Sequence, residues 1–554
     1  MKTGHAHAKM ELLAVAGILC AMAAAPAVGN AEIRVLKTTL NGGVPTANIR
    51  SGHPDSVLPE GFALRATAKG SDPLENPSGT ITHFGYLNDF PPQLIEPTKT
   101  EPDENTYLVF DHNPGGPTAG YDYGRHFLFQ GHENHNDLAY ITRVNLDVFD
   151  PAHRITLLTP VGDDGKTHFN SIDGSTWNPF SRTLLFTQEN GSAGGVIELN
   201  PQWGSSAHTL DGIIGQGGFE GIHPDENGNL IIAEDVGGTS VNVDPTDPSS
   251  PKTARNPNSF VYRFVPTNPH HLSEGGKLEA LQVWIDGSPV AFVAIDASHP
   301  TGDVFSENQL KLHTLGTSWP VRWITVHDTE VDGTTPFDAN KAAKNAGATP
   351  FKRPENFQFL PGSGFNTFFF DATGDTSALS GNQPALAARG AWGSIFRVDF
   401  PWNSGEGELS IQVLGDGTHA AFDNLTFLGT NVLLVGEDRG DTLHKQLNAL
   451  DSVWTYDVRN LNQPAARLLA LGRNPSSEVD AALLDAGTTG FQNDGDNETT
   501  GIHYSDGSTT KNGILGKPTN PNRSRLFFTQ QHGDNVIYEV ITHPWKKNSD
   551  SDDE

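Results

Sequence analysis

The chain has 554 residues and a formal net charge of −30, from 66 Asp plus Glu against 36 Lys plus Arg. This charge excludes a generic nucleic-acid binder, which needs a basic surface. The 59 Gly and 37 Pro suit many short strands joined by turns better than a helical bundle, and 30 Phe and 9 Trp supply a sizeable core.

Residues 1–31 have the pattern of a secretory signal peptide. A weakly basic start precedes an apolar run from Leu12 to Ala25, and a small-residue cleavage site ends at Ala31. The run is too short for a transmembrane helix, and no later stretch reaches the ~18 residues that such a helix requires. We therefore expect an exported protein, periplasmic or secreted, with no membrane partner. Cleavage would also remove Cys20, the single cysteine, and with it any thiolate ligand.

The strongest internal signal is a short apolar strand that ends in an acidic or amide residue and occurs six times. Several copies follow a second polar element, such as Glu220-Gly-Ile before the strand that ends at Glu234. Such a unit cannot bury its sheet faces alone, and radial stacking of about six units gives a β-propeller. The copies are Phe127–Glu133, Leu184–Glu189, Leu230–Glu234, Phe368–Asp371, Leu433–Glu437 and Leu526–Gln530.

We therefore predict an all-β fold, a six-bladed β-propeller over residues 32–545 with loop and short helical insertions. Residues 237–258 read as a loop insertion. A larger insertion near 270–350 is predicted to contain a short helix, 338–345, capped by Asp338. Residues 546–554 are predicted to form a disordered acidic tail.

The acidic strand ends predict a partial ring of carboxylates, because equivalent strand ends of a propeller meet at one mouth of its channel. Carboxylates that are brought together out of water stay ionised only if cations neutralise them. Oxygen-only ligands favour Ca²⁺ or Mg²⁺, with Mn²⁺ or iron also possible. Taken singly, each acid is better read as a turn former or a solvated edge charge, and only the recurring set favours a metal site. The predicted ring members are Glu133, Glu189, Glu234, Asp371 and Glu437.

Arg353 lies two residues before Glu355, just ahead of an acid-ended strand. A guanidinium beside a carboxylate–metal centre is suited to hold two oxygens of a phosphate. The alternative is a plain Arg–Glu salt bridge in a loop.

With these residues in view, the chain resembles the PhoX-type alkaline phosphatases, a family of exported six-bladed propellers with a metal cluster in the funnel. Two runs are fairly specific, Ser259–Pro266 (SFVYRFVP) and Gly347–Glu355 (GATPFKRPE). Shorter matches are Gly131–His135, Asn170–Trp177, Leu184–Glu189, Ile232–Asp235, Asp423–Leu425, Gly436–Asp438 and Gln531–Gly533.

The resemblance implies a phosphomonoesterase that uses iron and calcium. It implies that Arg353 contacts the phosphate and that Arg353 and Glu355 form the catalytic centre. Asn134 and Gln531 would be further substrate contacts. By matching motifs, the implied metal ligands are Glu189, Glu234, Glu355 and Asp438.

The sequence departs from the family at Ser171, which stands where the family has a cysteine ligand of iron. A neutral hydroxyl is a poor substitute for a thiolate on iron. Three alternatives follow: Asp173 supplies an oxygen in its place, or the cluster is all-oxygen and all-calcium, or phosphatase activity is lost. Calcium is therefore favoured over iron.

Three functions stay open at this point. The first is an exported calcium-dependent phosphatase, expected to act as a monomer on small-molecule phosphoesters. The second is a lactonase or phosphotriesterase-like hydrolase on the same scaffold, since propellers host many chemistries. The third is a non-catalytic, calcium-stabilised binding propeller. Arg353 favours the first function over the second, because lactones need no anion clamp, whereas Ser171 favours the third.

Overall fold

The computed structural model describes most of the chain between residues 56 and 542. Within this part the protein is all-β with a few short helices, as predicted. The predicted signal peptide, 1–31, and the predicted acidic tail, 546–554, lie outside it. The described residues are 56–87, 98–204, 206–401, 405–460, 464–472, 498–511, 523–531 and 534–542.

Four separate antiparallel sheets have four strands each. In each sheet, strands that follow one another along the chain pair side by side. The first sheet contains β5 (Glu101–Val109), β6 (His126–Glu133), β7 (Tyr140–Asn145) and β8 (Ile155–Leu157). The second contains β9 (Ile172–Asn178), β10 (Thr183–Gln188), β11 (Gly195–Leu199) and β12 (Ala207–Thr209). The third contains β25 (Phe422–Leu428), β26 (Val432–Glu437), β27 (Ser452–Asp457) and β28 (Ala466–Ala470).

The fourth sheet joins the two ends of the described chain. Its order is β1-β31-β30-β29, so the first described strand pairs with the last. Pairing of this kind closes a circular arrangement of sheets and leaves fewer exposed strand edges. The strands are β1 (Phe62–Ala68), β29 (Thr499–Ser505), β30 (Arg525–Gln530) and β31 (Val536–Thr542).

The remaining large sheet has ten strands and contains two four-stranded runs. β20 (Ser318–Asp328) pairs with β18 on one side and with β24 on the other, and so joins the two runs; β19 (Ser288–Pro289) pairs with β18. The first run is β13 (Phe219–Pro224), β14 (Leu230–Glu234), β17 (Val261–Pro266) and β18 (Gly276–Ile285). The second is β21 (Pro354–Phe359), β22 (Thr367–Ala372), β23 (Ser394–Asp399) and β24 (Glu406–Leu414).

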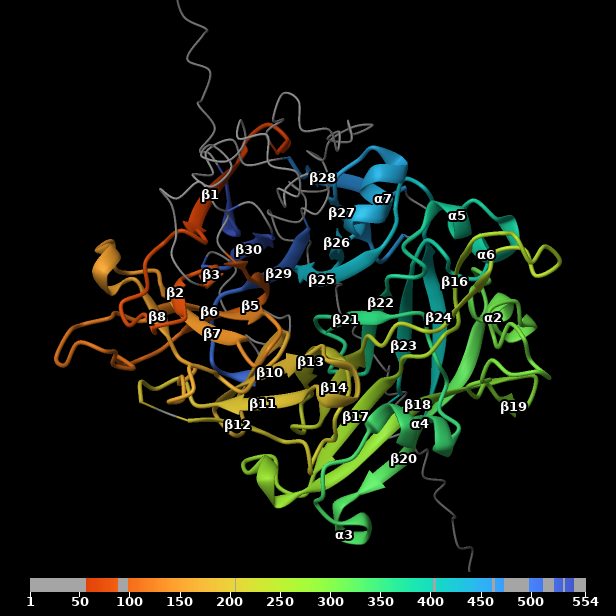
Figure 1. The fold of residues 1–554 in the computed structure, drawn as a ribbon, viewed down its shortest axis with the longest axis horizontal. Helices are drawn as coiled ribbons and strands as arrows, with labels where there is room; N and C mark the ends of the chain where they lie inside the picture. Colours follow the sequence, from red (N-terminus) through yellow and green to blue (C-terminus); the bar gives the residue numbers. More distant parts are fainter. Residues whose placement is uncertain are drawn as a thin grey trace, which may run out of the picture.

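The sheets follow one another around a common centre in chain order, which is a propeller-like arrangement (Figure 1). The first strand of each four-stranded run lies innermost. These strands, β5, β9, β13, β21, β25 and β29, contact one another in this cyclic order, and β29 contacts β5 again. The repeated strands predicted from the sequence are the second strands of the runs, β6, β10, β14, β22, β26 and β30.

Apolar side chains fill the spaces between adjacent sheets. The largest cluster includes Phe127, Phe186, Phe357 and Phe370, all buried and contributed by different strands. Burying such side chains is the main stabilising term for the fold and holds the inner strands around the centre.

Short elements lie in the insertions between the sheets. The predicted helix is present as α4 (Ala339–Ala346), and its N-cap is Asp338, whose carboxylate accepts a hydrogen bond from the backbone N–H of Lys341 at 2.8 Å. The predicted loop 237–258 contains a hairpin of β15 (Ser240–Asn242) and β16 (Lys252–Arg255). The other helices are α2 (Glu307–Leu312), α3 (Thr329–Asp332), α5 (Ala378–Gly381), α6 (Pro384–Ala387) and α7 (Gly440–Leu447). A small sheet of β2 (Ile81–His83), β3 (Tyr86–Leu87) and β4 (Thr98–Lys99), and three 3₁₀ turns at Pro151–His153, Gly191–Ala193 and Leu272–Glu274, complete the described elements.

None of the helices in the described part of the chain has the length and apolar character that crossing a membrane requires.

Candidate metal centre and anion site

In five of the six inner strands, a β-bulge places an acidic side chain at the centre. On β5, Asp103 and Glu104 together face Gly131 of β6, and on β13, Glu220 and Gly221 face Ala233 of β14. A bulge of this kind re-aims the first of its two residues and locally increases the twist of the strand. The first residues of the acidic bulges are Asp103, Asp173, Glu220, Glu355 and Asp423.

The ends of the second strands supply a further set of acids. The backbone N–H groups of Glu189, Asp235 and Asp438 each donate to the residue two positions before the bulged acid of the neighbouring strand, at 2.9, 2.8 and 2.8 Å. Glu133 occupies the same place in its sheet, because it pairs with Glu101. These four acids therefore take equivalent positions in four sheets and lie beside the bulged acids.

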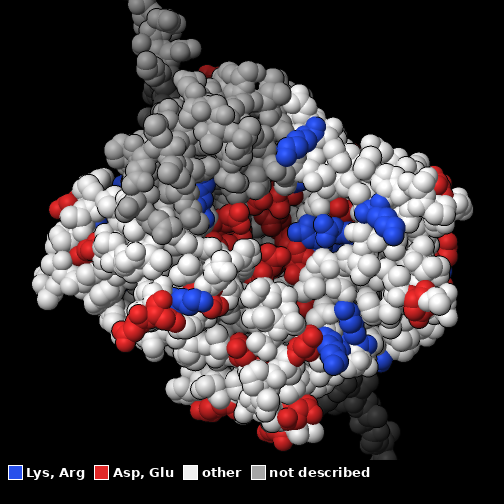
Figure 2. All heavy atoms as spheres, viewed as in Figure 1, with Lys and Arg blue, Asp and Glu red and all other residues white. Residues whose placement is uncertain are grey.

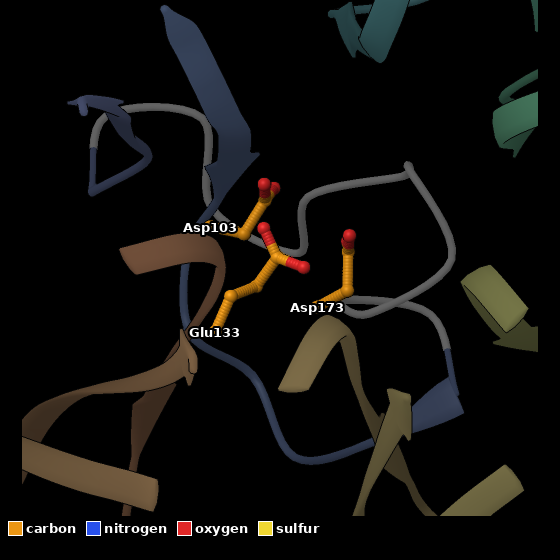
Figure 3. Close-up of side chains that lie close together, drawn as sticks. All are labelled: Asp103, Glu133 and Asp173. Carbon is orange, nitrogen blue, oxygen red and sulfur yellow. The ribbon is translucent and has the colours of Figure 1, made fainter. Parts of the chain in front are cut away.

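Three groups of carboxylates are close enough to hold a metal ion. In each group, oxygen atoms from the three side chains lie within 4.8 Å of one another. Figure 3 shows the carboxylates of one group pointing toward a common space from β5, β6 and β9. On the surface, acidic side chains gather in a hollow near the centre of the face drawn in Figure 2, with basic side chains beside it. The groups are Asp103–Glu133–Asp173, Asp173–Glu189–Glu220 and Glu220–Asp235–Glu355. We call these seven residues the carboxylate cluster.

Burial and mutual repulsion destabilise the ionised form of the carboxylates in the cluster. Burial, with repulsion from neighbouring carboxylates, raises the pKa of Asp103 to about 7 and that of Glu189 to about 8. The same two causes raise the pKa values of the other cluster acids for which a shift is resolved. These are Glu133, Asp173, Glu220 and Glu355.

Two observations show that a divalent cation fits the cluster. Asp173 Oδ1 and Asp235 Oδ1 are buried and accept no hydrogen bond, so each has an unused ligand atom. All donor atoms of the cluster are carboxylate oxygens, the ligand type that calcium and magnesium prefer. A cation would offset the repulsion that raises these pKa values.

Arg353 forms ion pairs with two members of this cluster. Its Nε donates to Asp235 Oδ2 at 2.6 Å, and its Nη2 lies 3.5 Å from Glu355 Oε1. The side chain keeps 19% of its exposure, so it is held by carboxylates without being sealed from solvent. Despite the cost of burial, attraction from Asp235, Glu355 and Glu189 raises its pKa well above the ordinary arginine value, so it stays protonated. Its φ of +60° is in the left-handed region, a conformation that non-glycine residues adopt mainly at sites of local constraint.

The structure brings most of the predicted ligands together, but it places Glu234 elsewhere. Glu189, Glu355 and Asp173 belong to the carboxylate cluster, and the charge of Asp438 raises the pKa values of Asp103 and Glu189. Glu234 Oε2 instead accepts hydrogen bonds from Tyr262 Oη, Asn340 Nδ2 and the backbone N–H of Phe260. Successive residues of a strand point to opposite faces, so the next residue, Asp235, faces the centre in its place.

Two other members of the predicted ring, Asp371 and Glu437, are not among the clustered carboxylates either. Asp371 accepts a hydrogen bond from the backbone N–H of Asn356, and Glu437 pairs with Arg439, so neither belongs to the cluster. Glu133 and Glu189 of the predicted ring do lie in the cluster, and the members that the sequence analysis did not predict are Asp103, Glu220 and Asp235. At 234–235 and at 437–438 a Glu is followed directly by an Asp. Either acid of such a pair could point to the centre, and the sequence alone does not show which one does.

The two predicted substrate contacts have unused amide atoms at the cluster. Asn134 follows Glu133, and its Nδ2 is buried without an acceptor. Gln531 donates from Nε2 to Asp103 Oδ2 at 2.9 Å, and its Oε1 is buried without a donor. Ser171 is buried with a φ of +43°, and its Oγ lies 3.5 Å from His135 Nδ1.

Comparison with known proteins agrees with this arrangement. The sequence model of the family described as alkaline phosphatase PhoX matches residues 239–510, which include Arg353, Glu355 and Asp438. Residues 239–510 are thus PhoX-like in sequence. No curated protein sequence matches the chain. A PhoX fold also accounts for the propeller-like arrangement of sheets, and the family supports a phosphatase-type function for this chain.

Solved structures share the fold at low sequence identity. The structure of Pseudomonas fluorescens PhoX in complex with vanadate, a transition state analogue, matches with a TM-score of 0.52 at 12% identity, over 91% of this chain and 97% of that one. A gluconolactonase from Xanthomonas campestris matches with a TM-score of 0.36 at 10% identity, over 90% of this chain and 95% of that one. The first likeness shows a common fold.

Proposed function

We propose that the protein is an exported, metal-dependent phosphomonoesterase of the PhoX type, with a calcium-containing carboxylate cluster as its catalytic centre. The observation that carries the proposal is Arg353, a solvent-accessible guanidinium that two carboxylates of the cluster hold at its edge. A binding propeller needs cations for stability, but it has no need of an arginine at the same place. An arginine beside bound cations is instead suited to a phosphate ester.

The chain's own residues would bind and orient the phosphate. Arg353 offers the N–H groups that its carboxylate partners do not use, and Asp235 and Glu355 fix the plane of its guanidinium. Asn134 Nδ2 supplies a second donor that has no acceptor within the described chain. Divalent cations on the cluster would add Lewis acidity and would activate water for attack on phosphorus.

The Thr373 hydroxyl helps to hold this side of the centre. It donates to Glu355 Oε1 and fixes that carboxylate next to Arg353. Gln531 does the same for Asp103 on the opposite side. These contacts fix the positions of the carboxylates relative to Arg353, as a preorganised centre requires.

Several finer properties belong to the same proposal. We propose calcium because the donors are all oxygen and Ser171 replaces a thiolate. We propose six blades, counting the ten-stranded sheet as two, because the innermost strands contact one another in a closed cycle. Export rests on the pattern of residues 1–31, and we propose a monomer that acts on small phosphoesters.

The test is hydrolysis of p-nitrophenyl phosphate at alkaline pH by the purified protein, in calcium and after chelation, with bound metals quantified on the same sample. We expect calcium-dependent turnover, and we expect Arg353→Ala to lower kcat/KM by about 10²–10³-fold, because it removes charge stabilisation from the transition state. Arg322→Ala is the matched control, since Arg322 is exposed on β20 and contacts Gln282 and Trp284 instead.

Two results would contradict the proposal. Stoichiometric calcium without turnover of any phosphoester would indicate the binding propeller. Turnover of a lactone with no loss in Arg353→Ala would indicate the lactonase.

A further inference from the structure

The hairpin β15–β16 brings a second arginine to the edge of the carboxylate cluster. Arg255 is the last residue of β16, in the insertion that follows Asp235. Its Nη1 lies against Gly237, two residues after Asp235, where a Cβ atom would approach Nη1 to 2.7 Å. A side chain at position 237 would therefore displace the guanidinium, so the end of the Arg255 side chain lies directly against the backbone that follows Asp235.

A buried ion pair fixes the backbone of Arg255 relative to Arg353. The backbone N–H of Arg255 donates to Asp375 Oδ1 at 3.2 Å, and the same oxygen accepts from Lys352 Nζ at 2.8 Å. The side chains of Lys352 and Asp375 are only 1% and 0% exposed. Since Lys352 directly precedes Arg353, this pair ties the two arginine-bearing segments together.

The two arginines differ in whether a carboxylate pairs with the guanidinium. Arg353 is held by Asp235 and Glu355, whereas no carboxylate of the described residues lies within salt-bridge distance of the Arg255 guanidinium. Burial lowers the pKa of Arg255, and repulsion from Arg353 lowers it further, while attraction from Asp235 and Glu355 opposes both. A half-buried guanidinium that is repelled by a neighbouring guanidinium is unfavourable unless an anion lies near both of them.

We infer that Arg255 is a second phosphate-binding residue, which contacts the phosphoryl oxygens of the substrate from the hairpin side while Arg353 contacts them from the cluster side. The inference rests on the proposed phosphatase function and deepens it, since it assigns the substrate's anion to two arginines. It predicts that the site binds dianionic phosphate well and has little affinity for neutral esters or lactones. Two guanidinium groups can satisfy more phosphate oxygens than one, and their charges offset those of the phosphate.

The experiment compares Arg255→Ala and Arg255→Lys with the wild-type protein, both as full chains loaded with calcium. Binding of inorganic phosphate is measured by calorimetry, and KM and kcat are measured with p-nitrophenyl phosphate. We expect the alanine variant to weaken phosphate binding and to raise KM by about tenfold or more, with a smaller change in kcat. We expect the lysine variant, which keeps the charge but loses the planar fork, to lie between the two.

Lys252→Ala is the matched control. Lys252 is an exposed cation on the same strand, so its removal changes the charge of the hairpin by the same amount without touching the cluster. Thermal unfolding of every variant reports whether it folds. If Arg255→Ala proves unstable, Arg255→Lys and Arg255→Gln carry the comparison.

The outcomes separate this inference from the proposed function. Phosphate affinity that is lost in Arg255→Ala but kept in Lys252→Ala supports the inference, whether or not the wild type hydrolyses esters. Equal phosphate affinity and equal KM in the wild type and in Arg255→Ala overturn it, even if the wild type is a phosphatase. A wild type that binds no phosphate overturns both.

Discussion

Lys352 and Asp375 are almost completely removed from water, yet they form a direct ion pair at 2.8 Å. Removing two charges from water is costly, and their attraction repays the cost only when the geometry is good and the remaining atoms are satisfied. Asp375 Oδ1 also accepts the backbone N–H of Arg255, which adds to the pair, while Oδ2 has no donor. The pair therefore contributes more to fixing the positions of the Arg255 and Arg353 segments than to the net stability of the fold.

We predict that Asp375→Ala destabilises the protein by about 3–5 kcal/mol, because it leaves the Lys352 ammonium buried without a counter-charge. Chemical denaturation monitored by tryptophan fluorescence measures the change. The control is Asp399→Ala, which removes the partner of Arg397 in a half-exposed ion pair and should cost about 1 kcal/mol or less. A smaller loss for Asp375→Ala than for Asp399→Ala would contradict this account of the buried pair.

At the scale of elements, closure of the propeller depends on β1. Leu64 of β1 pairs with Val540 of β31 and packs against the apolar cluster of this sheet and its neighbour. β1 is contributed from the opposite end of the described chain, so its contacts are long-range and hold the first and last sheets together.

We predict that Leu64→Asp lowers the free energy of unfolding by about 2–4 kcal/mol, because it places a charge in the apolar layer under the closing strand. Ala66→Asp is the control on the same strand, since Ala66 is exposed and its replacement should change stability by about 0.5 kcal/mol or less. Thermal unfolding and protease sensitivity provide the measurements. Equal effects of the two substitutions would argue against β1 as the element that closes the fold.

The sequence predicted the second strands better than the innermost ones, for a physical reason. The apolar runs that end at Glu133, Glu189 and Glu437 are buried on both faces, and this gives them a continuous hydrophobic signal. The inner strands carry polar residues at the bulges, so their pattern is interrupted where the cluster forms.

The choice between Glu234 and Asp235 illustrates what the sequence could not decide. Both are acidic and both end the same strand, and a shift of one residue reverses the side to which each points. The pairing of Glu234 with Phe219, and the hydrogen bond from Asp235 N to Gly218 O at 2.8 Å, show the register that the chain adopts. The position of Arg255 was equally hidden, because it depends on the path of an insertion.

For the whole molecule, the carboxylate cluster links stability to pH and to cations. Burial and repulsion raise the pKa of Asp103 to about 7 and that of Glu189 to about 8, so the folded state binds these protons more tightly than an unfolded chain, whose carboxyl groups titrate near 4. The resulting stability is present in full below about pH 4 and is lost as the pH rises through about 7 to 8.

We predict that the chelated protein unfolds at a lower temperature at pH 9 than at pH 6, and that added calcium restores most of the difference. Thermal unfolding in a chelator between pH 5 and 9, repeated in calcium, measures both effects. Other groups set the stability at still lower pH, so the comparison is confined to this range. A chelated protein that becomes more stable between pH 6 and 9 would contradict the prediction.

The strand β20 has a consequence for how the centre moves. It hydrogen-bonds both to β18 and to β24, so the ten-stranded sheet is one continuous ladder rather than two separate ones. Asp235, Arg255, Arg353 and Glu355 all belong to this ladder or to loops that it anchors. Continuous ladders open in hydrogen exchange as large cooperative units. The residues on the anion-binding side of the centre would thus move together as one rigid unit. Asp103, Glu133 and Asp173 belong to separate sheets, which can shift independently of that unit.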